Sequence, residues 1–199
     1  MKKILVLGCG EWQYQPKKED HPCEIHNLDY VDRKQPNFIN HNLNLFPYPY
    51  ADNTFDKIIM YNVLEHLCLY DRYNEYWINI FSELYRILTP DGKVEILAPH
   101  FAGCASIMEH HHLFSCGDFY LKFKHKKQDW LTMMNGMDFR IDHMEITFPR
   151  FNKWIGKLVN MSEFNQTLYE KYFCGIIRSV DLLVILAKDN PKDLKTPIV

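Results

Sequence analysis

Residues 4–10 read Ile-Leu-Val-Leu-Gly-Cys-Gly, an apolar run that ends in two glycines one residue apart. Such a run, bounded by glycine, is typical of a strand buried on both faces and predicts a parallel strand at residues 4–7. Gly8 and Gly10 lack a Cβ, so a ligand can lie against their peptide groups. A plain strand and turn has the same pattern as a strand that ends in a site for a nucleotide-like ligand. The rest of the chain has to distinguish these two interpretations.

Further strands and one long helix follow this start. The helix is predicted at residues 71–88, where Ile78, Phe81 and Leu84 recur at helical spacing, and the Thr-Pro-Asp-Gly of residues 89–92 turns the chain. Strands and connections that alternate in this way predict an α/β fold with a mostly parallel, doubly wound sheet. The remaining strands of this sheet are predicted at residues 24–29, 37–42, 56–61 and 93–98.

The second half of the chain is less regular. Residues 115–124 and 164–173 are predicted to be helical, and residues 139–148 and 179–187 are predicted to be strands. We expect these last two strands to form a hairpin-like antiparallel edge, with the helix between them. We expect residues 1–190 to be a single domain and residues 191–199 to be a loose tail.

Composition narrows the functional classes. The net charge of −2 gives no general attraction to nucleic acid or to an anionic membrane, and no apolar run is long enough to span a bilayer. The six cysteines are scattered without a Cys-x-x-Cys pair, and the N-terminus lacks the features of a signal peptide. These features predict a cytoplasmic protein in a reducing compartment, without a membrane partner.

Chemistry-bearing residues gather where the predicted parallel strands end. Gly8 and Gly10 follow the first strand, Asp29 ends the second, Asn62 follows the fourth and His100 follows the fifth. The carboxyl ends of parallel strands share one edge of an open sheet, and ligands bind there. Asp29 stands at a distance from the glycines at which an acidic residue can accept both hydroxyls of a ribose.

The motifs at these strand ends resemble those of the class I S-adenosylmethionine-dependent methyltransferases. The order matches across nearly the whole chain: Leu-Gly-Cys-Gly at 7–10, Asn-Leu-Asp at 27–29, Leu-Glu-His-Leu at 64–67, and Glu-Leu-Tyr-Arg-Ile-Leu-Thr-Pro-Asp-Gly at 83–92. The resemblance implies a Rossmann-like class I methyltransferase fold whose last strand runs antiparallel to the rest. It also implies S-adenosylmethionine as the cofactor and a methyl acceptor as the partner. We expect the acceptor to be an oxygen or nitrogen atom of a small molecule, either sugar-like or another metabolite.

The resemblance also implies which residues contact the cofactor. Gly8, Cys9 and Gly10 would lie against its methionine part, and Asp29 would hold the ribose hydroxyls. The adenine would be flanked by Asn42 and Leu43, and the sulfonium end would be faced by Asn62, Val63 and His66.

Two departures from the family pattern keep other functions open. Val6 replaces an acidic residue that would pair with the methionine ammonium, and Trp12 replaces a third glycine. A non-catalytic binding or partner protein with the methyltransferase fold is therefore one alternative. A nucleic-acid or protein methyltransferase is another, with nucleic acid disfavoured by the charge. A nicotinamide dehydrogenase shares the glycine turn, but Gln13 breaks its Gly-x-Gly-x-x-Gly pattern.

The candidate catalytic residues are two histidines. His100 follows the fifth strand on the edge where an acceptor would bind, and His110 matches a histidine of the resembled proteins. Histidine is the usual general base near neutral pH. The run His110-His111-His112 does not predict a metal site, because consecutive side chains seldom point to one centre. The basic run at 122–127 is interpreted as a solvated helix end, and Trp130, Phe148, Phe151 and Trp154 could wall an acceptor pocket.

Overall fold

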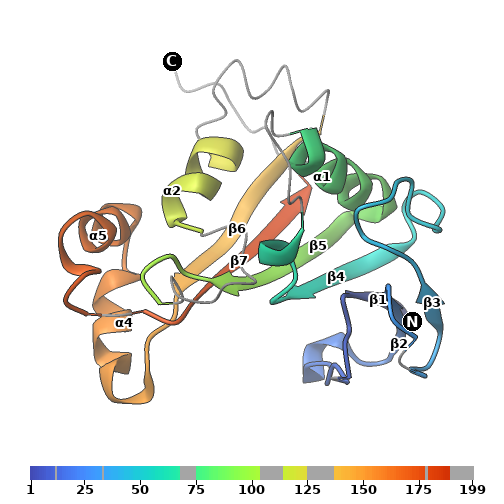
Figure 1. Ribbon diagram of the computed structural model, residues 1–199, viewed down its shortest axis with the longest axis horizontal. Coiled ribbons are helices and arrows are strands. Elements are labelled where there is room, and N and C mark those ends of the chain that lie inside the picture. Colours follow the sequence, from blue (N-terminus) through green and yellow to red (C-terminus); the bar gives the residue numbers. More distant parts are fainter. Residues whose placement is uncertain are drawn as a thin grey trace.

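The computed structural model describes residues 1–11, 13–32, 34–67, 75–103, 114–124, 137–177 and 179–188. The predicted tail at residues 191–199 lies outside this part of the chain. The model contains a seven-stranded sheet with the strand order β3-β2-β1-β4-β5-β7-β6 (Figure 1). Its strands are β1 (Lys2–Leu7), β2 (Cys23–Asp29), β3 (Phe38–Asn40), β4 (Phe55–Tyr61), β5 (Leu88–Pro99), β6 (Phe139–Ile146) and β7 (Asp181–Lys188).

The direction of the strands confirms the predicted topology. β1 pairs in parallel with β2 and β4, β2 with β3, and β4 with β5. β7 is antiparallel to both of its neighbours, β5 and β6. The fold is therefore an α/β sheet of mostly parallel strands with an antiparallel last strand, and β6 and β7 form the expected antiparallel edge.

Short helical elements connect the strands. Residues between β1 and β2 contain the single turn η1 (Lys18–Asp20), so the described part of this first connection has no long helix, as its two prolines predict. The other elements are η2 (Leu64–His66), α1 (Glu75–Ile87), α2 (Cys116–Phe119), η3 (Tyr120–Lys124), η4 (Arg150–Asn152), α4 (Lys153–Val159), α5 (Glu163–Leu168) and η5 (Tyr169–Phe173).

The turn predicted at residues 89–92 needs correction. α1 ends at Ile87 and β5 begins at once with Leu88, five residues before the predicted strand. Phe55 pairs with Leu88 and Lys57 pairs with Lys93, so β5 uses five positions where β4 uses two. The Thr-Pro-Asp-Gly sequence is thus an irregularity inside the strand pairing and not a separate turn, because Leu88 is fully buried beside β4.

The two faces of the sheet are covered differently. α1 and α2 lie on the same face (Figure 1), and their Phe81 and Phe119 pack into a large core with Leu5, Met60 and Val184. On the opposite face a smaller cluster forms around β1 and β4, with Tyr14 covering Ile4, Val6 and Ile59. Helices α1 and α2 therefore cover one face of this sheet, and Tyr14 from the segment of residues 13–20 covers part of the other.

Charged groups lie on that second face beside the small cluster. Lys57 Nζ is 3.0 Å from Asp20 Oδ2 and 3.0 Å from Glu95 Oε2, and Lys17 Nζ is 3.3 Å from Glu95 Oε1. The Tyr61 hydroxyl also donates to Glu95. We call Asp20, Lys57 and Glu95 the ion network; all three side chains are largely buried, and their charges are compensated because each has an opposite partner.

Candidate cofactor and acceptor site

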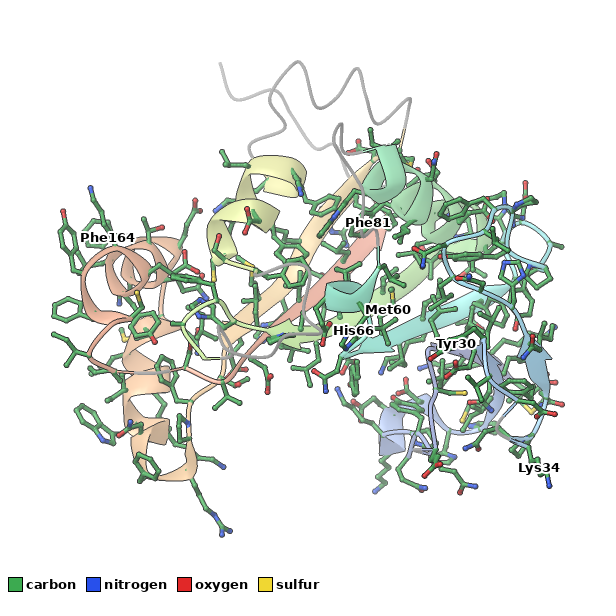
Figure 2. All side chains as sticks on the ribbon, in the orientation of Figure 1. Tyr30, Lys34, Met60, His66, Phe81 and Phe164 are labelled. Carbon is green, nitrogen blue, oxygen red and sulfur yellow. The ribbon has the colours of Figure 1, made fainter. Side chains whose placement is uncertain are left out.

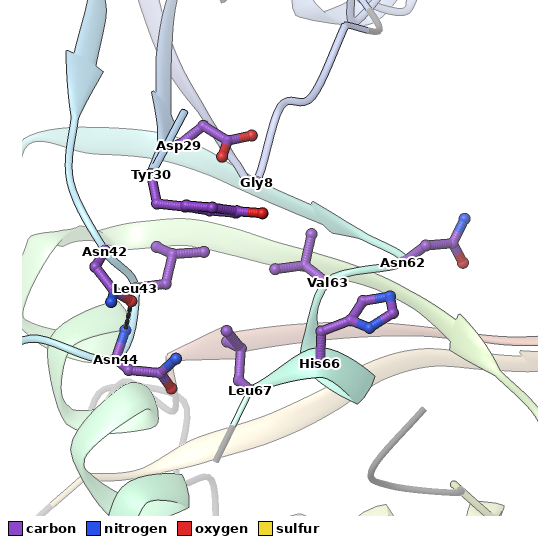
Figure 3. Close-up of a pocket in the computed structure, with 10 residues that line it drawn as sticks. All are labelled: Gly8, Asp29, Tyr30, Asn42, Leu43, Asn44, Asn62, Val63, His66 and Leu67. Carbon is purple, nitrogen blue, oxygen red and sulfur yellow. Dashed lines mark hydrogen bonds between the residues drawn. The ribbon is translucent and has the colours of Figure 1, made fainter. Parts of the chain in front are cut away.

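A cavity of about 500 Å³ lies at the carboxyl ends of β1, β2 and β4. Its size is that of an ordinary small-molecule site, and its position is the one where open α/β sheets bind ligands. Figure 3 shows Asn42, Leu43 and Asn44 at one end and Asn62, Val63 and His66 at the other. The lining residues are Gly8, Asp29, Tyr30, Asn42, Leu43, Asn44, Asn62, Val63, His66 and Leu67.

The glycine turn is built by backbone conformation. Gly8 and Gly10 have φ of +60° and +54°, in the left-handed region that favours glycine. A Cβ on Gly8 would lie 2.5 Å from Val63 Cγ2, so β1 and the start of η2 can meet only because this side chain is absent. Gly8 N–H donates to Leu28 O at 2.8 Å, which ties the turn to β2.

Asp29 is held in place by the same turn. Its Oδ2 accepts a hydrogen bond from Gly10 N–H at 2.8 Å, and its Oδ1 accepts one from Val31 N–H at 3.3 Å. The residue is only 5% exposed, yet it lines the cavity. Because a carboxylate has about four acceptor positions, two bonds to the backbone leave capacity for two hydroxyl donors of a ligand.

Seven of the nine residues expected at the cofactor line this one cavity; Cys9 and Gly10 are not among its walls. Cys9 is buried in the small core cluster, and Gly10 acts through its N–H on Asp29. Tyr30, Asn44 and Leu67 also line the cavity and were not expected from the sequence. For Tyr30 a signal was present, since a large aromatic residue directly follows the acidic end of a strand.

Tyr30 and Leu43 face each other across the cavity. Tyr30 is 71% exposed although it is a large aromatic residue, whereas Leu43 is 6% exposed. In Figure 3 the Tyr30 ring lies between Asp29 and Leu43. The exposed ring offers a flat aromatic wall and Leu43 an aliphatic one, which together suit a planar base.

Asn62 and His66 lie at the other end of the cavity. Asn62 follows β4 with a φ of +54°, a conformation that asparagine tolerates, and its N–H donates to Leu97 O at 2.8 Å. His66 ends η2 with its side chain 40% exposed, and Figure 3 shows its imidazole on the Asn62 side. A hydrogen-bonding amide and an imidazole thus stand together at this end.

His100 is fully buried and does not line the cavity. Its Nδ1 accepts from Ala102 N–H at 3.3 Å and lies 2.7 Å from Ser179 Oγ, while its Nε2 lies 3.0 Å from Glu170 Oε1. With Nδ1 accepting, the network assigns the ring proton to Nε2, which donates to Glu170. His110, the second candidate, lies outside the described residues.

Glu170 links His100 to α2. Its Oε1 also accepts from Cys116 N–H at 2.6 Å. Burial, reinforced by the charge of Glu170, raises the pKa of the Cys116 thiol, so this cysteine stays protonated. The cluster of His100, Glu170 and Ser179 therefore fastens the end of β5 to α2 and to the start of β7.

The aromatic residues expected around an acceptor are dispersed. Phe148 is buried in the main core, while Phe151 and Trp154 are 79% and 63% exposed, and none of them lines the cavity. Trp130 lies outside the described residues. Among the described residues, no group of three or more His, Cys, Asp and Glu side chains could hold a metal ion, and no helix is long and apolar enough to cross a membrane.

Comparisons with known proteins agree with this geometry. Residues 5–96 match the family model described as a methyltransferase domain. A comparison with curated protein sequences finds no match. The model resembles a SAM-dependent methyltransferase from Archaeoglobus fulgidus, with a TM-score of 0.60 and 13% identity over 94% of this chain and 86% of that one.

Two other solved structures have the same fold. One is an S-adenosylmethionine-dependent methyltransferase from Mesorhizobium loti, with a TM-score of 0.52 and 16% identity over 93% of this chain and 90% of that one. The other is the cyclase SpnF, with a TM-score of 0.50 and 14% identity over 94% of this chain and 74% of that one. The fold is that of the class I methyltransferases.

Proposed function

We propose that this chain, which has the class I methyltransferase fold, binds S-adenosylmethionine in the cavity beside Gly8 and Asp29 and transfers its methyl group to a small-molecule oxygen or nitrogen. The observation that carries the proposal is the Asp29 carboxylate, which two backbone N–H groups hold at the cavity wall with acceptor capacity to spare. Ribose presents two adjacent hydroxyl donors, and such a carboxylate suits them.

The remaining contacts divide along the cavity. Tyr30 and Leu43 would hold the adenine between them, with the Asn42 amide beside it. Asn62 would offer its amide oxygen to the methionine ammonium, a role for which the buried Val6 has no polar group. Cys9 would shape the turn from the core side and Gly10 would act by orienting Asp29, so neither needs to touch the cofactor.

Methyl transfer needs little acid–base catalysis from the protein. When bound, the cofactor supplies a methyl group on a sulfonium, and the protein has to align an acceptor with it and exclude water. His66, at the Asn62 end of the cavity, is placed to accept a proton from a hydroxyl or amine acceptor. His100 would be a positioning residue that holds the end of β5, because protein groups occupy both of its ring nitrogens.

Calorimetric titration with S-adenosylmethionine and its demethylated product tests the proposal. We expect both to bind and Asp29→Ala to weaken binding roughly 5- to 150-fold, because unpaired buried hydroxyls cost about 1–3 kcal/mol. Tyr30→Ala should weaken binding by a similar factor through lost stacking, and Tyr30→Phe should not. Asp32→Ala is the matched control, since Asp32 is an exposed acid three residues away whose Oδ1 accepts a hydrogen bond from Lys34 N–H.

Two outcomes separate this function from its alternatives. Absence of heat and of a thermal shift at millimolar cofactor contradicts the proposal as a whole. Binding without methyl transfer to any of a panel of hydroxyl and amine metabolites favours the non-catalytic binding protein. Because one structural neighbour is a cyclase, the transfer assay must follow the labelled methyl group and not only consumption of the acceptor.

A further inference from the structure

Exposed apolar side chains gather on η4, α4, α5 and η5. On the first segment, η4 with α4, Phe151, Trp154 and Leu158 follow one another at helical spacing, with exposed fractions of 79%, 63% and 53%. On the second segment, α5 with η5, Phe164, Leu168 and Tyr172 recur every four residues and are also exposed. Single exposed apolar residues are ordinary, but two aligned stripes mark an interaction surface. We call these six residues the apolar face.

The two stripes belong to one surface. An open apolar groove of about 360 Å³ is lined by Trp154 and Leu158 from α4 together with Leu168 and Phe173 from α5 and η5. Figure 1 shows α4 and α5 side by side at the end of the molecule opposite β3. Figure 2 shows Phe164 on the outer side of this end, pointing away from the sheet. The cofactor cavity lies near the other end, so the apolar face is separate from it.

Basic residues border the apolar face. Arg150, Lys153, Lys157 and Lys171 are all exposed on the same segment. Fewer acidic groups are described there: Glu163, which is paired with Lys124, and Glu170, which faces inward and is bonded to His100 and to Cys116 N–H. The segment is therefore locally cationic, although the whole chain has a net charge of −2.

This combination determines the partner. Tryptophan, phenylalanine and leucine on one face, with lysine and arginine along its border, are typical of helices that lie in the interface of an anionic membrane. A second copy of the chain is disfavoured, because a two-fold contact would bring the same basic border against itself. We propose that the apolar face docks this protein on an anionic lipid surface, lying on the membrane without crossing it.

The local charge explains why the sequence did not suggest this partner. The expectation of no membrane partner came from the net charge of the whole chain, which averages the basic border with acids elsewhere. Surface attraction falls off within about a Debye length, so the groups at the contact dominate it. The apolar residues then add burial in the headgroup region.

Vesicle co-sedimentation tests the proposal with the full chain. We expect binding to vesicles of phosphatidylcholine with phosphatidylglycerol, and much weaker binding to phosphatidylcholine alone or in high salt. Lys153→Gln with Lys157→Gln should weaken binding about 30-fold, since each basic residue near an anionic surface contributes about fivefold. Trp154→Ser with Phe164→Ser should abolish measurable binding.

Matched variants control for general effects. Lys18→Gln removes an exposed lysine, and Leu45→Ser removes an exposed apolar side chain, both remote from α4 and α5 in the sequence; neither should change binding. Unchanged circular dichroism must accompany every variant. No sedimentation with any vesicle overturns the proposal, as does sedimentation that all variants share equally. Dimers in ultracentrifugation that Trp154→Ser dissolves, without vesicle binding, assign the surface to a second copy instead. None of these readouts depends on methyl transfer.

Discussion

Glu65 is a carboxyl group buried beside the cofactor cavity. It is 0% exposed, and among the described residues no group forms a regular hydrogen bond with either carboxyl oxygen. His66 Nε2 lies 3.9 Å from Oε1. Burial raises the pKa of Glu65 and the charge of Asp181 adds to it, while its own backbone N–H and His66 oppose the shift.

This raised pKa predicts a pH-dependent stability. The folded protein holds a proton on Glu65 at pH values where the unfolded chain has lost it, so stability falls as the pH rises through this window. Glu65→Gln cannot ionise and should therefore gain melting temperature relative to the parent protein as the pH rises from acidic to neutral. A gain of 1 kcal/mol corresponds to roughly 2–4 °C. An equal difference in melting temperature at pH 4.5 and pH 8 would contradict this account.

At the residue scale, the sequence predicted that the residues at the strand ends lie together, and the structure places most of them around one cavity. Gly8, Asp29 and Asn62 come from three strands, and the parallel topology brings them to one cavity. Side chains whose place depends on tertiary packing were not predicted. Asn44 and Leu67 line the cavity because of the loop paths after β3 and η2, and no local pattern encodes those paths.

At the element scale, α1 holds the loop that precedes β4. Glu83 Oε2 accepts from Tyr48 N–H at 2.6 Å, and Arg86 donates to Tyr48 O, Tyr50 O and Asp52 Oδ1 at 3.0, 2.7 and 2.8 Å. Burial alone would raise the pKa of Glu83, but the bonds from Arg86 and Tyr48 N–H outweigh it and lower that pKa. Glu83 and Arg86 thus join α1 to the loop before β4, and the lowered pKa keeps the Glu83 carboxylate charged.

Arg86→Ala should destabilise the fold by about 2–4 kcal/mol, because the buried Glu83 carboxylate loses its cation and two backbone carbonyls lose the guanidinium donor. The lowered pKa of Glu83 means that this contribution is present at neutral pH and is lost as the pH falls. Chemical denaturation at pH 7 and pH 4 measures both effects. Arg150→Ala, at an exposed arginine, is the control and should change stability by less than about 0.5 kcal/mol. A cost for Arg86→Ala that is larger at pH 4 than at pH 7 would refute the assignment.

Element boundaries show the limits of sequence reading more clearly than element types do. Periodicity predicted α1, and apolar runs predicted the strands, because burial dictates both patterns. The early start of β5 was missed, since Thr89, Pro90, Asp91 and Gly92 have strong turn preferences. Tertiary pairing of Leu88 with Phe55 overrides those preferences.

At the scale of the whole molecule, the ion network connects parts of the chain that are far apart in the sequence. Lys57 of β4 bridges Asp20 of the first connection and Glu95 of β5. The bonds to Asp20 and Glu95 keep the pKa of Lys57 raised, although burial by itself would lower it. The ion network thus ties the first connection to the second face of the sheet, where the described chain has the η1 turn in place of a long helix.

Lys57→Met should cost about 3 kcal/mol of folding free energy, because it removes the most buried cation from two buried carboxylates. Asp20 and Glu95 then keep only Lys2 and Lys17, whose side chains are about half exposed. Lys93→Met is the matched control: its lysine side chain is 51% exposed and pairs with Asp142, so the loss should stay below about 1 kcal/mol. Urea unfolding of both variants measures the difference. Equal losses would show that burial of the network does not matter.

The Asp29 carboxylate, fixed by Gly10 N–H and Val31 N–H, has a consequence for affinity. The conformational entropy of ordering this edge is lost when the protein folds and is not subtracted again when a ligand arrives. Loosening the turn, for example by disturbing the Gly8 contact with Val63, would move that entropic cost from folding to binding. Affinity would then fall although every group that touches the ligand is still present.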